Sequence, residues 1–124
     1  MKSMNEINVE LAHCSGTEQY YYLRLNKRSV YTDGAQALFK LAGAYWLYDI
    51  IQTEIWDVIR KKAPKTYTFT ITSEHEKADL VLKDYMDVIL WKRHIDYTDF
   101  PEGSKDLIIG FDGERIITCL ISEN

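Results

Sequence analysis

Apolar residues in the first half of the chain recur at the three- and four-residue spacing that places side chains on one face of a helix. Thr32 or Asp33 can cap the first such segment, and Gly43 interrupts it. Basic residues at 60–62, followed by Pro64, favour a helix end there. The spacing predicts helices at about 33–42 and 44–62. Their expected buried stripes are Ala35, Leu38, Phe39 and Ala42, and then Ala44, Tyr48, Ile51, Ile55 and Ile59.

The N-terminal stretch supports two interpretations. Ser3 and Glu6 have the spacing of a capping box, which favours a helix near 4–12. The segment INVEL alternates between apolar and polar residues, however, so a short strand stays open as the alternative.

The second half of the chain changes to the two-residue period of a β-strand. Across 66–72 threonine occupies every even position, and Tyr67, Phe69 and Ile71 occupy the odd ones. Two further predicted strands follow, ADLVLKDY at 78–85 and DVILWKRHIDY at 87–97. A hairpin comes next, because Asp112-Gly113 tolerates the positive φ of a tight turn. We therefore expect one α+β domain over 1–124, with N-terminal helices packed on a C-terminal antiparallel sheet of about five strands.

Composition places the chain among ordinary globular proteins, since 46% of its 124 residues are hydrophobic and 27% are charged. No apolar run approaches the roughly 18 residues of a membrane span, and the N-terminus lacks the features of a secretion signal. Cys14 and Cys119 form no CxxC pair, which is typical of reduced thiols. These features predict a cytoplasmic protein without a membrane partner.

Charge is distributed unevenly along the chain, whose net charge is −4. Residues 1–62 carry 8 Lys/Arg against 7 Asp/Glu, whereas residues 63–124 carry 7 against 12. Direct nucleic-acid binding is not expected, because it needs a basic face.

Catalytic signatures are not evident in the sequence. His13, His75 and His94 lack a nucleophile with an orienting partner, paired zinc ligands are absent, and the six glycines are scattered singly. We predict no catalytic residue, no metal ligand and no cofactor, and we regard an enzyme as the less favoured class.

Asp49 is the most unusual residue of the predicted helices, because aspartate is a poor interior helix residue. Trp46, Asp49 and Trp56 fall on one flank at helical spacing, and aromatics beside charges are favoured in binding surfaces. The structural alternative is that Asp49 is half exposed or ties down the 31–34 turn or the 97–101 loop. The candidate binding residues are Asp33, Tyr45, Trp46, Asp49, Trp56 and Asp99.

Three segments carry a resemblance: GTEQYYY at 16–22, YTDGAQALFKLAGAYWLYDII at 31–51 and YTDFP at 97–101. Together the chain, over about residues 13–122, resembles a family of small bacterial proteins of unknown function. The resemblance implies a helical N-terminal part followed by an antiparallel sheet. It also implies shared residues to which the family assigns no role: Gly16, Thr17, Glu18, Thr32, Asp33, Gly34, Gly43, Ala44, Tyr45, Trp46, Asp49, Asp99, Phe100 and Pro101.

Two functions follow as expectations. The first is a non-enzymatic interaction protein that binds a protein partner, because aromatic residues make up 13% of the chain and Tyr20–Tyr22 cannot all face one core. Members of the family resemble accessory genes of bacteria, plasmids and phages, so an anti-CRISPR-like inhibitor of a host defence system is the sharpest version. The alternative is a small-ligand or metal-dependent pocket, including that of an enzyme, built around Asp33, Trp46, Asp49 and Asp99. Apolar stripes this wide also leave homo-oligomerisation open.

Overall fold

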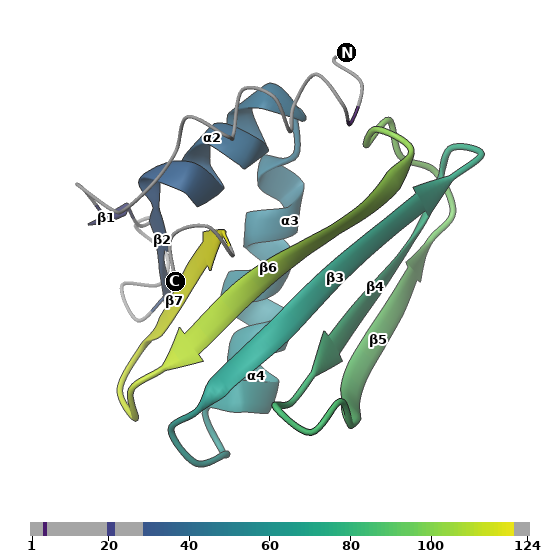
Figure 1. The fold of residues 1–124 in the computed structure, drawn as a ribbon. Helices are drawn as coiled ribbons and strands as arrows, with labels where there is room; N and C mark the ends of the chain where they lie inside the picture. Colours follow the sequence, from purple (N-terminus) through teal and green to yellow (C-terminus); the bar gives the residue numbers. More distant parts are fainter. Residues whose placement is uncertain (1–3, 5–19, 22–28, 121–124) are drawn as a thin grey trace.

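The computed structural model describes Met4, Tyr20–Tyr21 and residues 29–120 of the chain (Figure 1). Apart from Met4, the predicted helix near 4–12 lies outside the described residues, as does most of the segment 16–22. No helix among the described residues is long and apolar enough to cross a membrane.

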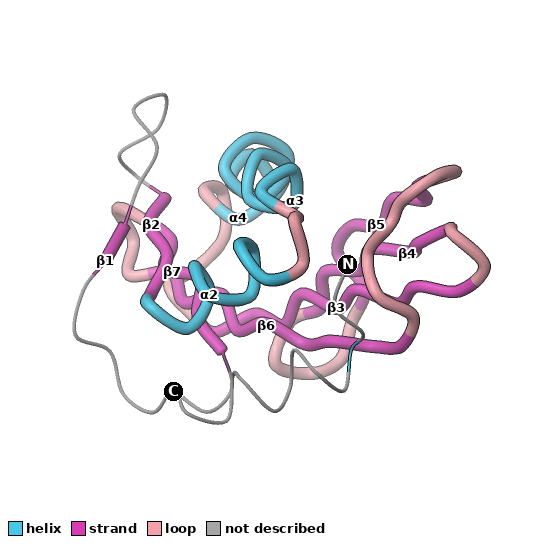
Figure 2. Tube along the Cα trace, turned by 90° about the horizontal axis from the view of Figure 1, so that it is seen from above, coloured by secondary structure: helices cyan, strands magenta, loops and turns pink. Residues whose placement is uncertain are grey.

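A seven-stranded mixed sheet forms one layer of the fold, with strand order β1-β2-β7-β6-β3-β4-β5 (Figure 1). Its strands are β1 (Tyr20–Tyr21), β2 (Ser29–Thr32), β3 (Thr66–Glu74), β4 (Lys77–Lys83), β5 (Ile89–Ile95), β6 (Gly103–Phe111) and β7 (Ile116–Leu120). The helices form a second layer on one face of this sheet (Figure 2). They are α2 (Asp33–Leu41), α3 (Tyr45–Ile50), the π-helical segment η1 (Ile51–Ile55) and α4 (Trp56–Ile59).

The predicted antiparallel sheet is confirmed for the second half of the chain. The prediction that the sheet is confined to that half is wrong. Strands β3 to β7 pair antiparallel with their neighbours among themselves, as expected. Strand β2 joins the same sheet from the first half and runs parallel to β7, with Val30 opposite Ile117. All four residues of β2 are buried, so they lack the alternation that marks a half-exposed strand. The helices therefore follow a strand of the sheet and do not form a separate N-terminal block.

The end of α2 explains why Gly43 interrupts the helical pattern. Gly43 adopts φ +61°, the left-handed conformation that glycine tolerates best. The Ala44 N–H donates to the Phe39 carbonyl at 2.8 Å, and the Gly43 N–H donates to the Lys40 carbonyl at 3.3 Å. These two bonds form a Schellman motif, which ends α2 and redirects the chain into α3.

The second predicted helix, 44–62, is shorter and less regular than expected. Helical structure runs continuously from Tyr45 to Ile59, but η1 adds a π-helical stretch in its middle, and residues 60–62 lie outside the helix. A π segment keeps the backbone hydrogen-bonded while it rotates the side chains that follow. Ile51 and Ile55 within the π segment and Ile59 after it are all fully buried.

The core lies between the helices and the inner face of the sheet. Both predicted helical stripes are buried, and so are Tyr67, Phe69 and Ile71 of β3. Tyr48 is the largest fully buried side chain, and its hydroxyl donates to the Ser29 carbonyl of β2. Burial raises the pKa of Tyr48 to about 12. This hydrogen bond joins the helical layer to the strand that the sequence did not reveal.

The predicted hairpin at Asp112-Gly113 joins β6 to β7. Gly113 adopts φ +100°, and the Asp112 carboxylate accepts hydrogen bonds from the Glu114 and Arg115 N–H groups at 2.8 and 2.9 Å. These backbone donors, first Arg115 and then Glu114, lower the pKa of Asp112. The turn is therefore held by its own polar groups.

Candidate functional site

Trp46 and Asp49 of the flank predicted from Asp49 lie on α3, and Trp56 begins α4. Asp49 is exposed, whereas Trp46 and Trp56 are half-buried. Trp56 packs edge-on against Phe111 of β6, with ring centroids 6.1 Å apart. One edge of each tryptophan ring therefore packs against the core, and only the exposed remainder can contact a partner.

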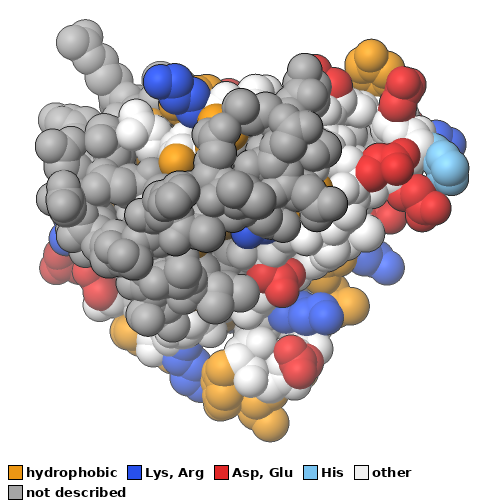
Figure 3. All heavy atoms as spheres, turned by 45° about the horizontal axis from the view of Figure 1, so that its top comes forward, with side chains coloured by type: hydrophobic (Ala, Val, Ile, Leu, Met, Phe, Trp, Pro, Cys, Tyr) orange, Lys and Arg blue, Asp and Glu red, His pale blue; other side chains and the backbone are white. Residues whose placement is uncertain are grey.

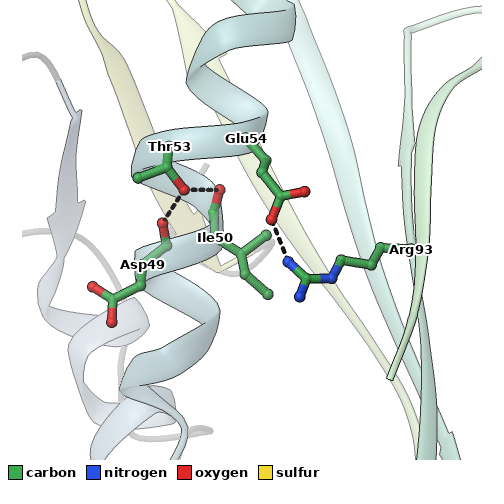
Figure 4. A network of polar contacts seen from close by, with 5 residues as sticks. All are labelled: Asp49, Ile50, Thr53, Glu54 and Arg93. Atoms are coloured by element: carbon green, nitrogen blue, oxygen red, sulfur yellow. Dashed lines mark hydrogen bonds and ion pairs between the residues drawn. The ribbon is translucent and has the colours of Figure 1, made fainter. Parts of the chain in front are cut away.

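The Asp49 carboxylate makes its contact within its own helix. It accepts a hydrogen bond from the Gln52 side-chain amide at 3.0 Å, and the Asp49 backbone carbonyl accepts one from the Thr53 hydroxyl at 2.7 Å. Figure 4 shows the carboxylate pointing away from the ion pair between Glu54 and Arg93. The contact with Gln52 is therefore a local tie, and it reaches neither the 31–34 turn nor the 97–101 loop.

Two other predicted site residues lie at the beginnings of helices. Asp33 is the first residue of α2, directly after Thr32, whose hydroxyl caps the helix by accepting from the Ala35 N–H at 3.3 Å. The side chain of Asp33 is outside the described part of the structure. Tyr45 begins α3 and is exposed, with its ring centroid 6.1 Å from that of Phe39.

Asp99 lies in the loop between β5 and β6. Thr98 and Phe100 on either side of it are buried. The Ser73 hydroxyl donates to the Phe100 carbonyl at 3.0 Å, and the Phe100 N–H donates to the Thr98 hydroxyl at 3.1 Å. Asp99 itself is exposed. Figure 3 shows acidic side chains grouped around a histidine at one end of the molecule. The TDFP segment is thus an anchored loop that displays a carboxylate.

Convergence of these carboxylates on a cation receives no geometric support. Among the residues that the structure describes, no three histidine, cysteine, aspartate or glutamate side chains gather closely enough to hold a metal ion. The three predicted carboxylates lie on separate elements, with Asp33 at the start of α2, Asp49 on α3 and Asp99 in the β5–β6 loop.

A different surface stands out in the structure, at the turn between β4 and β5. Six large hydrophobic side chains are exposed in the described part of the chain, and four of them fall within five consecutive positions. We call these four residues the tip, and their exposed fractions are 63% for Tyr85, 68% for Met86, 53% for Val88 and 54% for Ile89. Exposed apolar groups clustered in this way mark interaction sites in globular proteins.

The tip is built on an ordered turn. The Asp84 carboxylate accepts hydrogen bonds from the Met86 and Val88 N–H groups at 2.8 and 3.0 Å. The Asp84 N–H also donates to the Val88 carbonyl at 3.0 Å, and Asp87 adopts φ +62°. Aspartate is among the few residues that tolerate this left-handed conformation. The turn therefore presents its side chains in one arrangement.

Lys65, which precedes β3, supports the tip from the side. Its ammonium group donates to the Tyr85 hydroxyl at 3.1 Å and lies 4.3 Å from the centre of the Tyr85 ring. A shallow hollow of about 290 Å³ opens beside this contact, lined by Lys65, Thr66 and Tyr85. The phenol ring is thus held in place while most of it stays exposed.

Sequence reasoning missed the tip because the strand pattern absorbed its residues. A signal was present in the segment DYMDVI, where three large apolar residues stand in the connection between two strands and a fourth begins the second strand. Turns are normally polar, and consecutive exposed apolar residues are unfavourable unless they bind something. That signal could be recognised only once the structure had placed the turn between β4 and β5.

The chain belongs to a family of unknown function (DUF6876), whose model matches residues 5–124. A crystal structure of a protein of unknown function from Enterococcus faecalis is similar in fold, with a TM-score of 0.51. The two sequences are 16% identical, and the match covers 83% of this chain and 97% of that one. None of the curated proteins matches this chain. The expected membership of an uncharacterised family is confirmed.

Proposed function

We propose that this chain is a non-enzymatic interaction protein that docks on a protein partner through the tip. The observation that carries this proposal is the set of four exposed apolar side chains on one ordered turn. Tyrosine and other large side chains supply most of the binding free energy in protein interfaces. An ordered turn loses little conformational entropy on binding, so more of that free energy remains as affinity.

Three further features support docking at this place. The half-buried Leu90 and Trp91 continue the apolar surface from the tip into β5. Trp91 is held by stacking on Phe69, with ring centroids 6.2 Å apart. The tip also lies at an end of the sheet, where a partner approaches without displacing any described element (Figure 1).

The sharper version of the function is that the partner belongs to a bacterial defence system. This version stays a prediction, and the identity of a co-purified partner tests it. Expression of the chain in a strain that carries the matching defence system would then restore phage infection, and tip variants would not.

The test of the proposal is recovery of a partner from the native host. Tagged full-length protein, purified gently and weighed by native mass spectrometry, is expected to carry a macromolecule at fixed stoichiometry. The double variant Met86→Ser/Ile89→Thr should lose it and keep the melting temperature, because both side chains are exposed.

Tyr97→Ser is the matched control, since Tyr97 is 73% exposed but lies outside the tip. It should retain the partner. Recovery of the same partner with the double variant would exclude the tip as the docking surface. A bare monomer from every preparation would contradict the interaction function itself.

A further inference from the structure

Strand β5 is one edge of the sheet, and it begins at the tip. It pairs with β4 on one side, and among the described residues no strand pairs with its other side. An edge strand directs alternate backbone N–H and C=O groups outward, where an added strand can bind them. The free edge is continuous with the surface proposed above.

Part of this edge has the regular geometry that strand addition requires. A bulge interrupts the pairing between Leu82 and Lys83 of β4, near the first residues of β5. From Trp91 to Ile95 the register is continuous, with Trp91 opposite Leu82 and Ile95 opposite Ala78. Neither proline nor glycine occurs in β5. The stretch 91–95 therefore offers an uninterrupted template.

The charges on β5 have one sign. Lys92 and Arg93 are its charged residues, and the strand contains no acidic residue, although the chain as a whole carries a net charge of −4. Arg93 faces the helices and pairs with Glu54, as Figure 4 shows. His94 faces the opposite side of the sheet and contacts Asp79 at 2.8 Å. Lys92 is exposed and has no ion pair among the described residues, so its charge is available to a partner.

Pairing of β5 with a second copy of itself conflicts with these charges. An antiparallel pair centred on Lys92 sets this side chain opposite its own copy. A pair centred on Arg93 sets this side chain opposite its own copy. Like charges directly opposite one another destabilise a sheet. The same charges attract a strand that carries a carboxylate opposite Lys92.

We infer that β5 accepts an extended, acidic segment of the partner protein as an eighth strand, and this inference rests on the proposed interaction function. Backbone hydrogen bonds along 91–95 hold the segment. One of its carboxylates lies opposite Lys92, and an apolar residue at one end contacts the tip. The partner is therefore recognised by an acidic strand with one apolar anchor.

The test uses synthetic peptides and the isotopically labelled full-length chain. The probe is a short peptide of alternating valine and glutamate with a leucine at one end, and its counterpart carries lysine in place of glutamate. Amide chemical shifts should change along β5 and the tip with the glutamate peptide. Lys92→Glu should weaken binding of the glutamate peptide about tenfold and should strengthen binding of the lysine peptide. Lys61→Glu, the same charge change at an exposed residue after α4, should leave both affinities unaltered.

Methylation of the peptide backbone separates strand pairing from simple charge attraction. An added strand uses only alternate amides, so methylation of one alternate set should abolish binding and methylation of the other should be tolerated. Equal binding of both methylated peptides, equal binding of a single-stranded oligonucleotide, or no binding at all would overturn the inference. None of these outcomes affects the partner-recovery test of the tip, so the two proposals fail separately.

Discussion

Replacement of Tyr48 by phenylalanine tests how the helical layer is joined to β2. The variant keeps the buried ring and removes only the hydroxyl, which donates to the Ser29 carbonyl and lies 3.1 Å from the Ser29 hydroxyl oxygen. Loss of a buried hydrogen bond, with its acceptor left unsatisfied, costs about 1–3 kcal/mol. For a domain of this size, that cost corresponds to a fall in Tm of roughly 4–12 °C.

The difference in unfolding free energy between the wild-type protein and Tyr48→Phe should also depend on pH. The pKa of Tyr48 is raised from 10.0 to about 12 by burial, so between these values the unfolded chain has lost this proton and the folded protein retains it. Stability therefore falls as pH rises above 10. The loss at pH 11 is roughly 1.4 kcal/mol, and Tyr48→Phe removes this contribution. The advantage of the wild-type protein over the variant should shrink by that amount between pH 9 and pH 11.

Urea denaturation of both proteins across this pH range is the assay. Burial also raises the pKa of Tyr67 and lowers that of Lys105, but both effects cancel when the two proteins are compared at each pH. Tyr97→Phe, at an exposed tyrosine, should match the wild-type protein throughout. Equal stability of Tyr48→Phe at neutral pH, or a difference that does not change up to pH 11, would refute the proposed junction.

Three further substitutions probe the loop geometry and the core. Gly43→Ala should lower the free energy of unfolding by roughly 1–2 kcal/mol, because alanine is strained at φ +61°. Gly110→Ala, where an added Cβ meets no atom within 4 Å, should be tolerated in the same urea titration, and equal losses would contradict the assigned strain. Thr118→Val should raise stability by about 1 kcal/mol, since the buried Thr118 hydroxyl has no hydrogen-bond partner among the described residues; a lower Tm would show that this hydroxyl is satisfied. Asp84→Ala should accelerate hydrogen exchange at the Met86 and Val88 amides and weaken partner binding, while exchange in β3 and β6 stays unchanged. Unaltered exchange at both amides would mean that the turn does not depend on the Asp84 carboxylate.

Local chemistry was sufficient for the elements whose patterns are complete within a few residues. Apolar spacing located α2 and the buried side of the following helix, and alternation separated the threonine face of β3 from its core face. The Gly43 helix end and the Asp112-Gly113 turn were readable because each depends on the backbone conformation of one or two residues. Spacing likewise assigned Trp46, Asp49 and Trp56 to a helix, but it did not reveal the π-helical segment between Asp49 and Trp56.

The pairing of strands and the exposure of side chains depended on contacts between residues that are distant in the sequence. The parallel pairing of β2 with β7 joins residues far apart in the chain, and a fully buried strand of four residues carries no alternation. The sequence located Asp49 on a helix but did not determine that its carboxylate is exposed and bonded to Gln52. The tip and the free edge of β5 exist only because β4 and β5 end the sheet, and no described strand pairs with the outer side of β5 (Figure 1). Sequence alone thus determined the main helical segments and the strands of the second half, because their periodicity is set by near neighbours. Only the tertiary structure decided that residues 29–32 join the sheet and which surfaces remain open to a partner.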